Sequence, residues 1–225
     1  MNNVFLFFIS CTIIVGCSRY AAKQGIGLLT AWIAILSLLA NFFVLKQITL
    51  FGLNATASDV FAIGSMWSLN VLQEQYGKEA AKKAIWASFM GLGFFTVMAN
   101  IHLAYEPSVF DTSQSAYIAL LAPTPRILIG SLLAFFISQQ CDRKLFERMK
   151  LHFPQLSQPS RSALTLICSQ AIDTVLFGLF ALYGLLDALA ELMLWSFMIK
   201  CIAIGAMLPS ALLTEQRKRT KTHAC

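Results

Sequence analysis

Residues 26–45 read IGLLTAWIAILSLLANFFVL, which is a run of twenty residues without a charged side chain. A helix of about 20 apolar residues is long enough to cross the hydrocarbon core of a bilayer. The run stops at Lys46, and polar residues follow it. This stretch therefore predicts a transmembrane helix, and the rest of the chain repeats the same kind of signal.

The overall composition supports a membrane protein. Of the 225 residues, 57% are hydrophobic and 12% are charged. A soluble domain carries about 25% charged residues, so this chain cannot cover a water-exposed surface and most of its surface must face lipid. The excess of 17 basic over 11 acidic residues is read as orientation charge. We expect a lipid bilayer and no nucleic acid as partners.

Long apolar stretches separated by polar breaks predict an all-α, polytopic membrane helix bundle. The segments run over about 3–18, 26–45, 56–74, 84–105, 115–141, 162–186 and 188–213. This divides the chain into an extra N-terminal segment (1–25), a six-helix domain (26–213) and a basic tail (214–225).

The first segment also resembles a lipoprotein signal, because Ile14-Val15-Gly16 precedes Cys17. A signal peptide begins with positive charge, but here the bases Arg19 and Lys23 follow the apolar run. We expect the segment to be retained as a span.

The bases in the connections alternate between the two sides of the predicted bundle. One side holds only Lys46, whereas fourteen bases fall on the other side: Arg19, Lys23, Lys78, Lys82, Lys83, Arg143, Lys144, Arg148, Lys150, Arg161, Arg217, Lys218, Arg219 and Lys221. The positive-inside rule makes the second side cytoplasmic. The C-terminus is then cytoplasmic, with the N-terminus outside for seven spans or inside for six.

Three charged residues lie eleven or twelve positions into predicted spans, namely Arg126, Asp173 and Lys200. At 1.5 Å per residue they could meet at one depth near mid-membrane. Ionisable groups there are costly, so they indicate either a structural ion pair or a polar substrate cavity. Pro123 and Pro125 predict a break in the helix just before Arg126.

Two predicted spans carry the same polar pattern, Ser-x6-Ser-Gln-x-x-Asp, which starts at Ser131 and again at Ser162. Serines and aspartates at these spacings share a helix face, so each pattern forms a stripe that must avoid lipid. Other polar residues of predicted spans are Asn41, Asp59, Asn70 and Glu74, and the spacing places Asp59 and Asn70 on one face.

Four stretches match motifs in order and spacing over about residues 35–213. They are Glu74-Gln75-Tyr76-Gly77-Lys78 with Ala81 to Trp86, Arg126-Ile127 with Ser131, Ser138-Gln139 and Asp142, Ser169-Gln170 with Asp173-Thr174 and Phe177, and Lys200. They resemble the bacterial queuosine precursor transporters, once described as putative vitamin uptake transporters. Two features depart from that family. Asn70 stands where an aspartate is usual, and Asp59 could serve in place of that acid. The first segment is an addition to the six spans that are typical of the family.

The resemblance implies a secondary transporter that imports queuine or another 7-deazaguanine base across the bacterial inner membrane for tRNA modification. Asp173 would accept from the N–H groups of the base, and Arg126 or Lys200 would donate to its carbonyl. The full set of expected substrate-binding residues is Asn41, Asn70, Glu74, Arg126, Gln139, Gln170, Asp173 and Lys200.

Other classes are less compatible with the sequence. It carries no GxxxxGK[ST] signature, so we expect no ATP hydrolysis and no cofactor. An enzyme would need a nucleophile–base pair or a metal cluster, and the scattered His and Cys residues offer neither. The alternative that remains open is a substrate-binding subunit of an energy-coupling vitamin or nucleobase importer. The small size is compatible with a homodimer.

Overall fold

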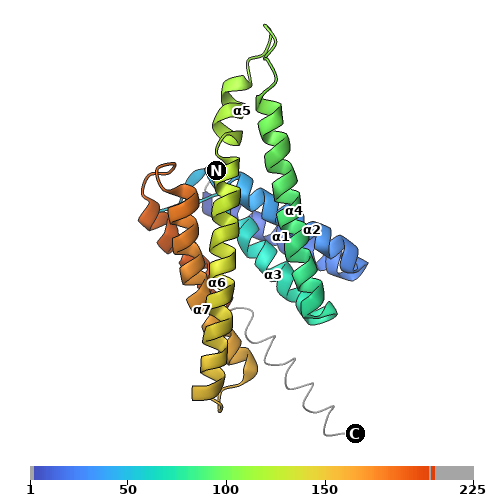
Figure 1. The fold of residues 1–225 in the computed structure, drawn as a ribbon, viewed down its shortest axis with the longest axis vertical. Helices are drawn as coiled ribbons and strands as arrows, with labels where there is room; N and C mark the ends of the chain where they lie inside the picture. Colours follow the sequence, from blue (N-terminus) through green and yellow to red (C-terminus); the bar gives the residue numbers. More distant parts are fainter. Residues whose placement is uncertain (1–2, 203, 206–225) are drawn as a thin grey trace.

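The computed structural model describes residues 3–202 and 204–205, and Figure 1 shows a helical bundle with one small hairpin. The elements are α1 (Asn3–Gln24), α2 (Ile26–Phe42), β1 (Gln47–Leu50), β2 (Leu53–Thr56), α3 (Asp59–Tyr76), α4 (Lys78–Leu103), α5 (Gln114–Leu121), α6 (Thr124–His152), α7 (Gln158–Phe177) and the π-helix η1 (Gly178–Leu182). A further helical segment covers 189–202. The end of the last predicted span and the basic tail lie outside the described residues.

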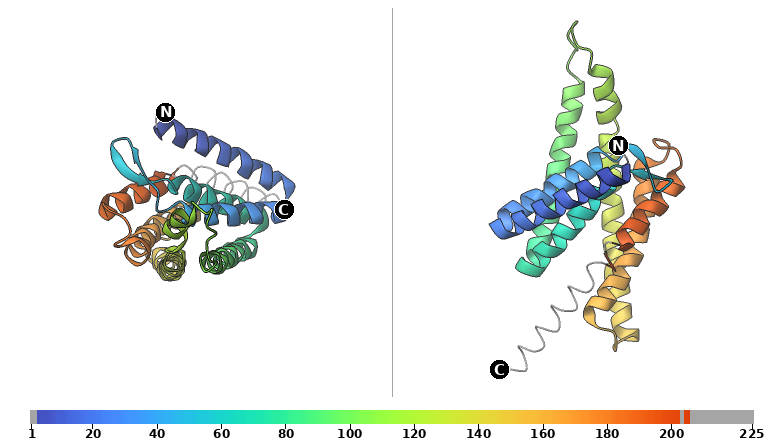
Figure 2. Two further views of the ribbon diagram at one scale, coloured as in Figure 1. Left: turned by 90° about the horizontal axis from the view of Figure 1, so that it is seen from above. Right: turned by 180° about the vertical axis from the view of Figure 1, so that it is seen from behind.

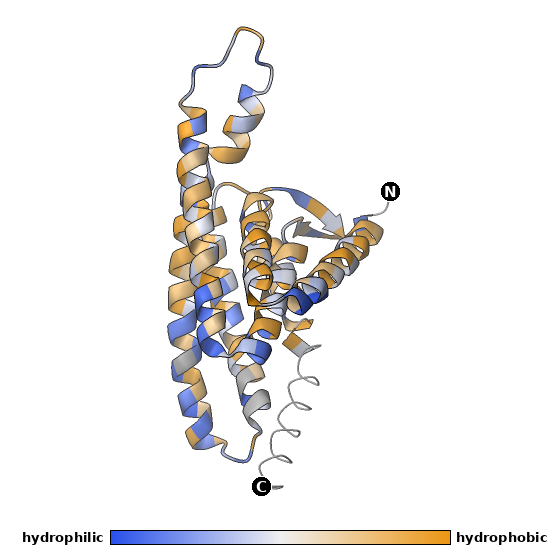
Figure 3. Cartoon of the chain, turned by 90° about the vertical axis from the view of Figure 1, so that its right-hand side faces the viewer, coloured by the Kyte–Doolittle hydropathy of each residue, from blue (hydrophilic) through white to orange (hydrophobic). Residues whose placement is uncertain are grey.

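Four helices of the described part are long and apolar enough to cross a membrane. They are Asn3–Gln24, Lys78–Leu103, Gln114–His152 (which combines α5 and α6) and Ala163–Leu182. The helix α2 is apolar but shorter. Hydrophobic residues, coloured orange, predominate along these helices in Figure 3. The predicted fold class is therefore confirmed, and the protein is a multi-pass membrane protein.

The helices α1 to α4 pack as one group, and the left view of Figure 2 shows α1 lengthwise along the outer side of this group. Apart from Leu92, the buried side of α4 is a row of small residues at helical spacing, which lets the neighbouring helices approach closely: Ala80, Ala81, Ala84, Ser88, Thr96 and Ala99. Leu29 and Ile33 of α2 pack with Leu72 of α3 against this row. Small residues at every fourth position thus place α4 against the core of the group.

The second group contains α6, α7 and η1, with the 189–202 segment beside them. Ile127 of α6 packs against Ala181 and Leu182 of η1 and against Val44 after α2. The Ser131 hydroxyl of α6 also donates to Asn41 Oδ1 of α2, at 2.7 Å. The two groups therefore share a packed interface that involves both apolar and polar contacts.

The predicted span 115–141 lies within the apolar stretch Gln114–His152, which is interrupted once. The chain turns at Ala122 and Pro123, so that α5 ends at Leu121 and α6 begins at Thr124. Proline lacks an N–H and clashes with the preceding turn, which is why the break falls here. The predicted break before Arg126 is confirmed, and α6 then continues to His152.

The β1–β2 hairpin was not predicted, since its residues were read as a connection and the first residue of the next span. Phe51 and Gly52 both have positive φ, 51° and 82°. That pairing is typical of a tight two-residue hairpin turn. The hairpin is held to the 189–202 segment by Glu191, which accepts from the Asn54 N–H at 2.8 Å and from its Nδ2 at 2.9 Å.

Ser18 links three helices, because it accepts from Trp32 Nε1 of α2 at 2.9 Å and from the Ser68 hydroxyl of α3 at 2.8 Å. We expect Ser18→Ala to lower the free energy of unfolding by about 1 kcal/mol, since two buried donors lose their acceptor. The measurement is thermal unfolding in detergent. Ser10→Ala is the control, because that hydroxyl bonds only locally to Leu6 of its own helix, and an equal effect of both changes would contradict the prediction.

Candidate functional site

An ion pair between Asp173 of α7 and Lys200 of the 189–202 segment forms the centre of the candidate site. Lys200 Nζ lies 3.1 Å from Asp173 Oδ2 and 3.1 Å from Thr174 Oγ1. The Ser138 hydroxyl of α6 donates to Asp173 Oδ1 at 3.4 Å. The side chains of Lys200 and Asp173 remain 16% and 24% exposed. Three helices therefore contribute to one polar cluster that is only partly buried.

The repeated polar pattern is explained by reciprocal contacts between α6 and α7. Ser138 of α6 lies 3.4 Å from Asp173 of α7, and Ser169 of α7 lies 3.5 Å from Asp142 of α6. Each hydroxyl also has a shorter hydrogen bond to a carbonyl of its own helix, at 3.1 Å and 3.0 Å. Since the helices are antiparallel, the two contacts between serine and aspartate are related by a local twofold axis between them. The serine of each stripe thus serves the aspartate of the other, and only Asp173 has Lys200 as a partner among the contacts that the structure gives these two acids.

The ion pair keeps unused hydrogen-bonding capacity. An ammonium group has three N–H donors, and Lys200 directs two of them at Asp173 and Thr174. A carboxylate has about four acceptor positions, and Asp173 uses one for Lys200 and one for Ser138. A donor and two acceptor positions therefore remain side by side for a ligand.

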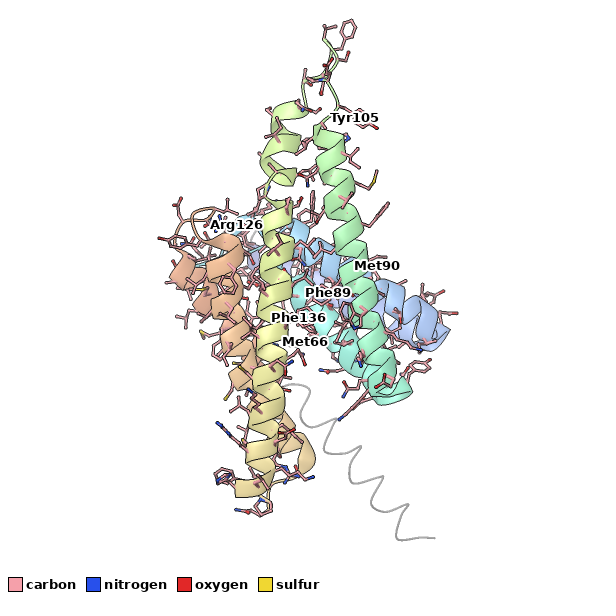
Figure 4. All side chains as sticks on the ribbon, in the orientation of Figure 1. Met66, Phe89, Met90, Tyr105, Arg126 and Phe136 are labelled. Atoms are coloured by element: carbon pink, nitrogen blue, oxygen red, sulfur yellow. The ribbon has the colours of Figure 1, made fainter. Side chains whose placement is uncertain are left out.

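Arg126 does not join this cluster, contrary to the expectation that the three charges could meet. Its Nε donates to the Phe180 carbonyl at 3.1 Å, and a second guanidinium nitrogen donates to the Tyr183 carbonyl. The break at Pro123 places Arg126 in the first turn of α6, twelve residues from Ser138 and hence about 18 Å along the axis. Arg126 therefore satisfies carbonyl groups where η1 ends, on the side of α6 seen in Figure 4.

The remaining predicted residues lie at several levels of the bundle. Asn41 contacts Ser131 and lines a small hollow of about 10 Å³, together with Phe42, Leu92, Phe95, Thr124 and Ile127. Gln170 is half-buried on α7, and Gln139 is exposed on α6. Asn70 is half-buried on α3, and Glu74 is exposed near the end of that helix.

Aromatic side chains occupy the space between α4 and α6. Phe89 of α4 meets Phe135 edge-on with ring centres 5.0 Å apart, and Trp86 lies 6.1 Å from Phe136. Figure 4 labels Phe89 and Phe136 at this boundary. These rings make the α4–α6 interface apolar, so the polar cluster is confined to the other side of α6.

Two further acids lie near the site, and of these the sequence suggested a role only for Asp59, as a substitute for the aspartate that is usual at position 70. Asp59, at the start of α3, is 5% exposed and lies within electrostatic reach of Lys200. Glu191 anchors the hairpin through Asn54. Both are ionisable residues inside predicted apolar segments. Asp173 was chosen as a site residue for that same reason, and the reason applies equally to Asp59 and Glu191.

Gly130 allows α6 to approach η1 below the site. A Cβ atom at this position would lie 2.8 Å from the Cβ and 2.9 Å from the backbone N of Ala181. We expect Gly130→Ala to lower the free energy of unfolding by about 2 kcal/mol, because two backbones would have to separate. Gly93→Ala in α4 meets open space and is the matched control, which should be neutral or stabilising. Thermal unfolding of both variants is the measurement, and a neutral Gly130→Ala would contradict the packing.

Comparison with known proteins places the chain in a family. A protein of Bacillus subtilis (strain 168) named "Probable queuosine precursor transporter" is 33% identical over 189 residues, which is 83% of this chain and 82% of the relative. No solved structure matches the chain. The family model described as "Putative vitamin uptake transporter" matches residues 56–214, a range that contains Asp173, Lys200 and both polar stripes. Since this match covers more than half of the sequence, the protein belongs to that transporter family.

Proposed function

We propose that the protein is a secondary transporter that imports a 7-deazaguanine base, queuine or a precursor of queuosine, across the bacterial inner membrane. The observation that carries the proposal is the partly exposed Asp173–Lys200 pair, with a donor and acceptors left free in the middle of an apolar bundle. The name of the Bacillus subtilis relative supports this substrate class.

The chemistry of the pair matches the edge of a guanine-like ring. That edge carries a carbonyl acceptor next to N–H donors. The third N–H of Lys200 suits the carbonyl, and the free lone pairs of Asp173 suit the N–H groups. A site made of such paired polar groups rejects rings that lack them, because its own buried groups would then be unsatisfied.

The distribution of charge supports an orientation with the basic turns in the cytoplasm. The turns between α3 and α4 and between α6 and α7 lie at the lower end of Figure 1, and the α4–α5 loop lies at the upper end. Hydrophilic residues gather at the lower part of α6 and α7 in Figure 3. With α1 counted as a span, the N-terminus lies outside.

The test is a rescue experiment in a bacterial strain that neither makes nor imports queuosine precursors. The strain expresses this protein, receives queuine or one of two 7-deazaguanine precursors, and carries the enzymes that use each compound. Queuosine in tRNA is then measured. Rescue at low concentration is expected and identifies the substrate, whereas a membrane-inserted protein that rescues with none of the three would contradict the proposal.

A second arm separates a carrier from a subunit of an energy-coupling importer. The purified protein is placed in liposomes without any ATPase, and uptake of the compound that rescues is followed. A secondary transporter moves the compound alone, as we expect. If uptake requires partner ATPases and ATP, the alternative function is the correct one.

A further inference from the structure

Asp59 presents a buried carboxyl group with an unsatisfied oxygen beside the candidate site. The residue is 5% exposed, and its Oδ2 atom is buried with no hydrogen-bond partner in the described part of the chain. Thr56 at the end of β2 and Ser196 of the 189–202 segment lie beside the carboxyl group, and Lys200 interacts with it electrostatically. Three separate elements therefore enclose a group that prefers water when it is charged.

The charges around Asp59 do not balance if every group is ionised. Lys200 interacts electrostatically with Asp59, and it is already paired with Asp173 at 3.1 Å. Glu191, an acid of the 189–202 segment that also carries Lys200, accepts two hydrogen bonds from Asn54. A second ionised carboxylate would be a buried charge without a full partner, which is costly. A proton on Asp59 removes that cost.

We propose that Asp59 is the proton-binding residue of this transporter and that it couples proton entry to substrate entry by competing with Asp173 for Lys200. This inference rests on the proposed function. When Asp59 is protonated, Lys200 stays on Asp173 and the two present their free donor and acceptors to the base. When Asp59 is ionised, it attracts Lys200 and separates the pair that binds the base.

The direction of coupling follows from the same competition. The more acidic outer side favours protonated Asp59 and hence the assembled binding site. On the inner side the proton leaves Asp59, Lys200 moves toward it, and the base is released. One proton and one base therefore enter together, and no other reactant is needed.

The test uses purified full-length protein in liposomes, with a labelled 7-deazaguanine base as probe. With the membrane potential clamped at zero, an inward gradient of one pH unit should concentrate the base about tenfold in wild type. In Asp59→Asn we expect exchange of the base to persist without pH dependence, and the gradient-driven accumulation to be lost. Asp111→Asn, in the exposed α4–α5 loop, is the matched control and should behave as wild type.

A second variant keeps the test decisive if Asp59→Asn does not fold. Ser196→Ala removes a hydroxyl beside Asp59, so the ionised carboxylate loses stabilisation and the midpoint of pH-dependent exchange should move to higher pH. An unchanged midpoint would overturn the proposal.

The other outcomes separate this inference from the proposed function. Accumulation that follows a sodium gradient instead, or accumulation by Asp59→Asn, overturns the role of Asp59. Wild type that carries the base but ignores the pH gradient overturns the coupling alone. Wild type that does not carry the base at all overturns the proposed function as well.

Discussion

Replacing Asp173 by asparagine is expected to reduce uptake of a 7-deazaguanine base by about a hundredfold or more, because two charge-assisted hydrogen bonds to the substrate are lost. Asparagine keeps the shape of the side chain but offers a single acceptor oxygen, and its NH₂ group faces the N–H donors of the base. It also removes the negative charge that holds Lys200 at 3.1 Å. The measurement is the initial uptake rate in cells, normalised to the amount of protein in the membrane.

The local twofold relation supplies the control for this change. Asp142 occupies the equivalent place on α6 and accepts from Ser169, as Asp173 accepts from Ser138. Asp142→Asn should therefore keep uptake within about threefold of wild type, a loss smaller than that of one neutral hydrogen bond. If Asp173→Asn transports at the wild-type rate, Asp173 is not a substrate residue. If both variants fail equally, the acids act in packing between α6 and α7.

Hydropathy predicts the helices of this chain well, because the bilayer imposes a length and a composition on every segment that crosses it. The segment 84–105 is recovered as part of α4, and the proline break before Arg126 falls where a missing N–H requires it. The hairpin at 47–56 could not be found in this way. Its strands have four residues each, and their tight turn depends on positive φ at Phe51, which the residue type does not signal.

The candidate site was predictable only in part. Intramembrane charge pointed to Asp173 and Lys200, and the structure brings them together. The position of Arg126 along a span suggested the same depth, but the break before α6 moves it to the end of η1. A depth estimate assumes a continuous straight helix, and it fails where the helix is interrupted. The partners of Asp59 come from β2 and the 189–202 segment, and only tertiary structure could join them.

The twofold relation between the α6 and α7 stripes gives the repeated sequence pattern a physical cause. Ser138 and Ser169 each lie opposite the aspartate of the other helix, so these parts of the two stripes face one another and not the lipid. The symmetry is broken by Lys200, which reaches Asp173 from a third helix. A symmetric pair of acids thus becomes one ion pair and one contact between a carboxyl group and a hydroxyl group, and only the former has the ammonium donor that a carbonyl group needs.

The second large effect is expected for replacement of Lys200. Variants at this position distinguish an ion pair that only stabilises the fold from one that binds substrate. Lys200→Met keeps much of the apolar stem but leaves Asp173 without its cation, so we expect the free energy of unfolding to fall by about 3 kcal/mol. In the double variant Lys200→Met/Asp173→Asn no charge of this pair remains, and most of that stability should return. Thermal unfolding in detergent measures both.

Uptake by the same variants then decides what the pair does. If Lys200 and Asp173 serve only to hold α7 against the 189–202 segment, the double variant regains uptake along with stability. If they bind the base, the double variant is stable but inactive, because the donor for the carbonyl and the acceptors for the N–H groups are both gone. We expect the second result, with uptake lower than in wild type by about a hundredfold or more. The double variant lacks both the ammonium group and the carboxylate that are proposed to contact the base.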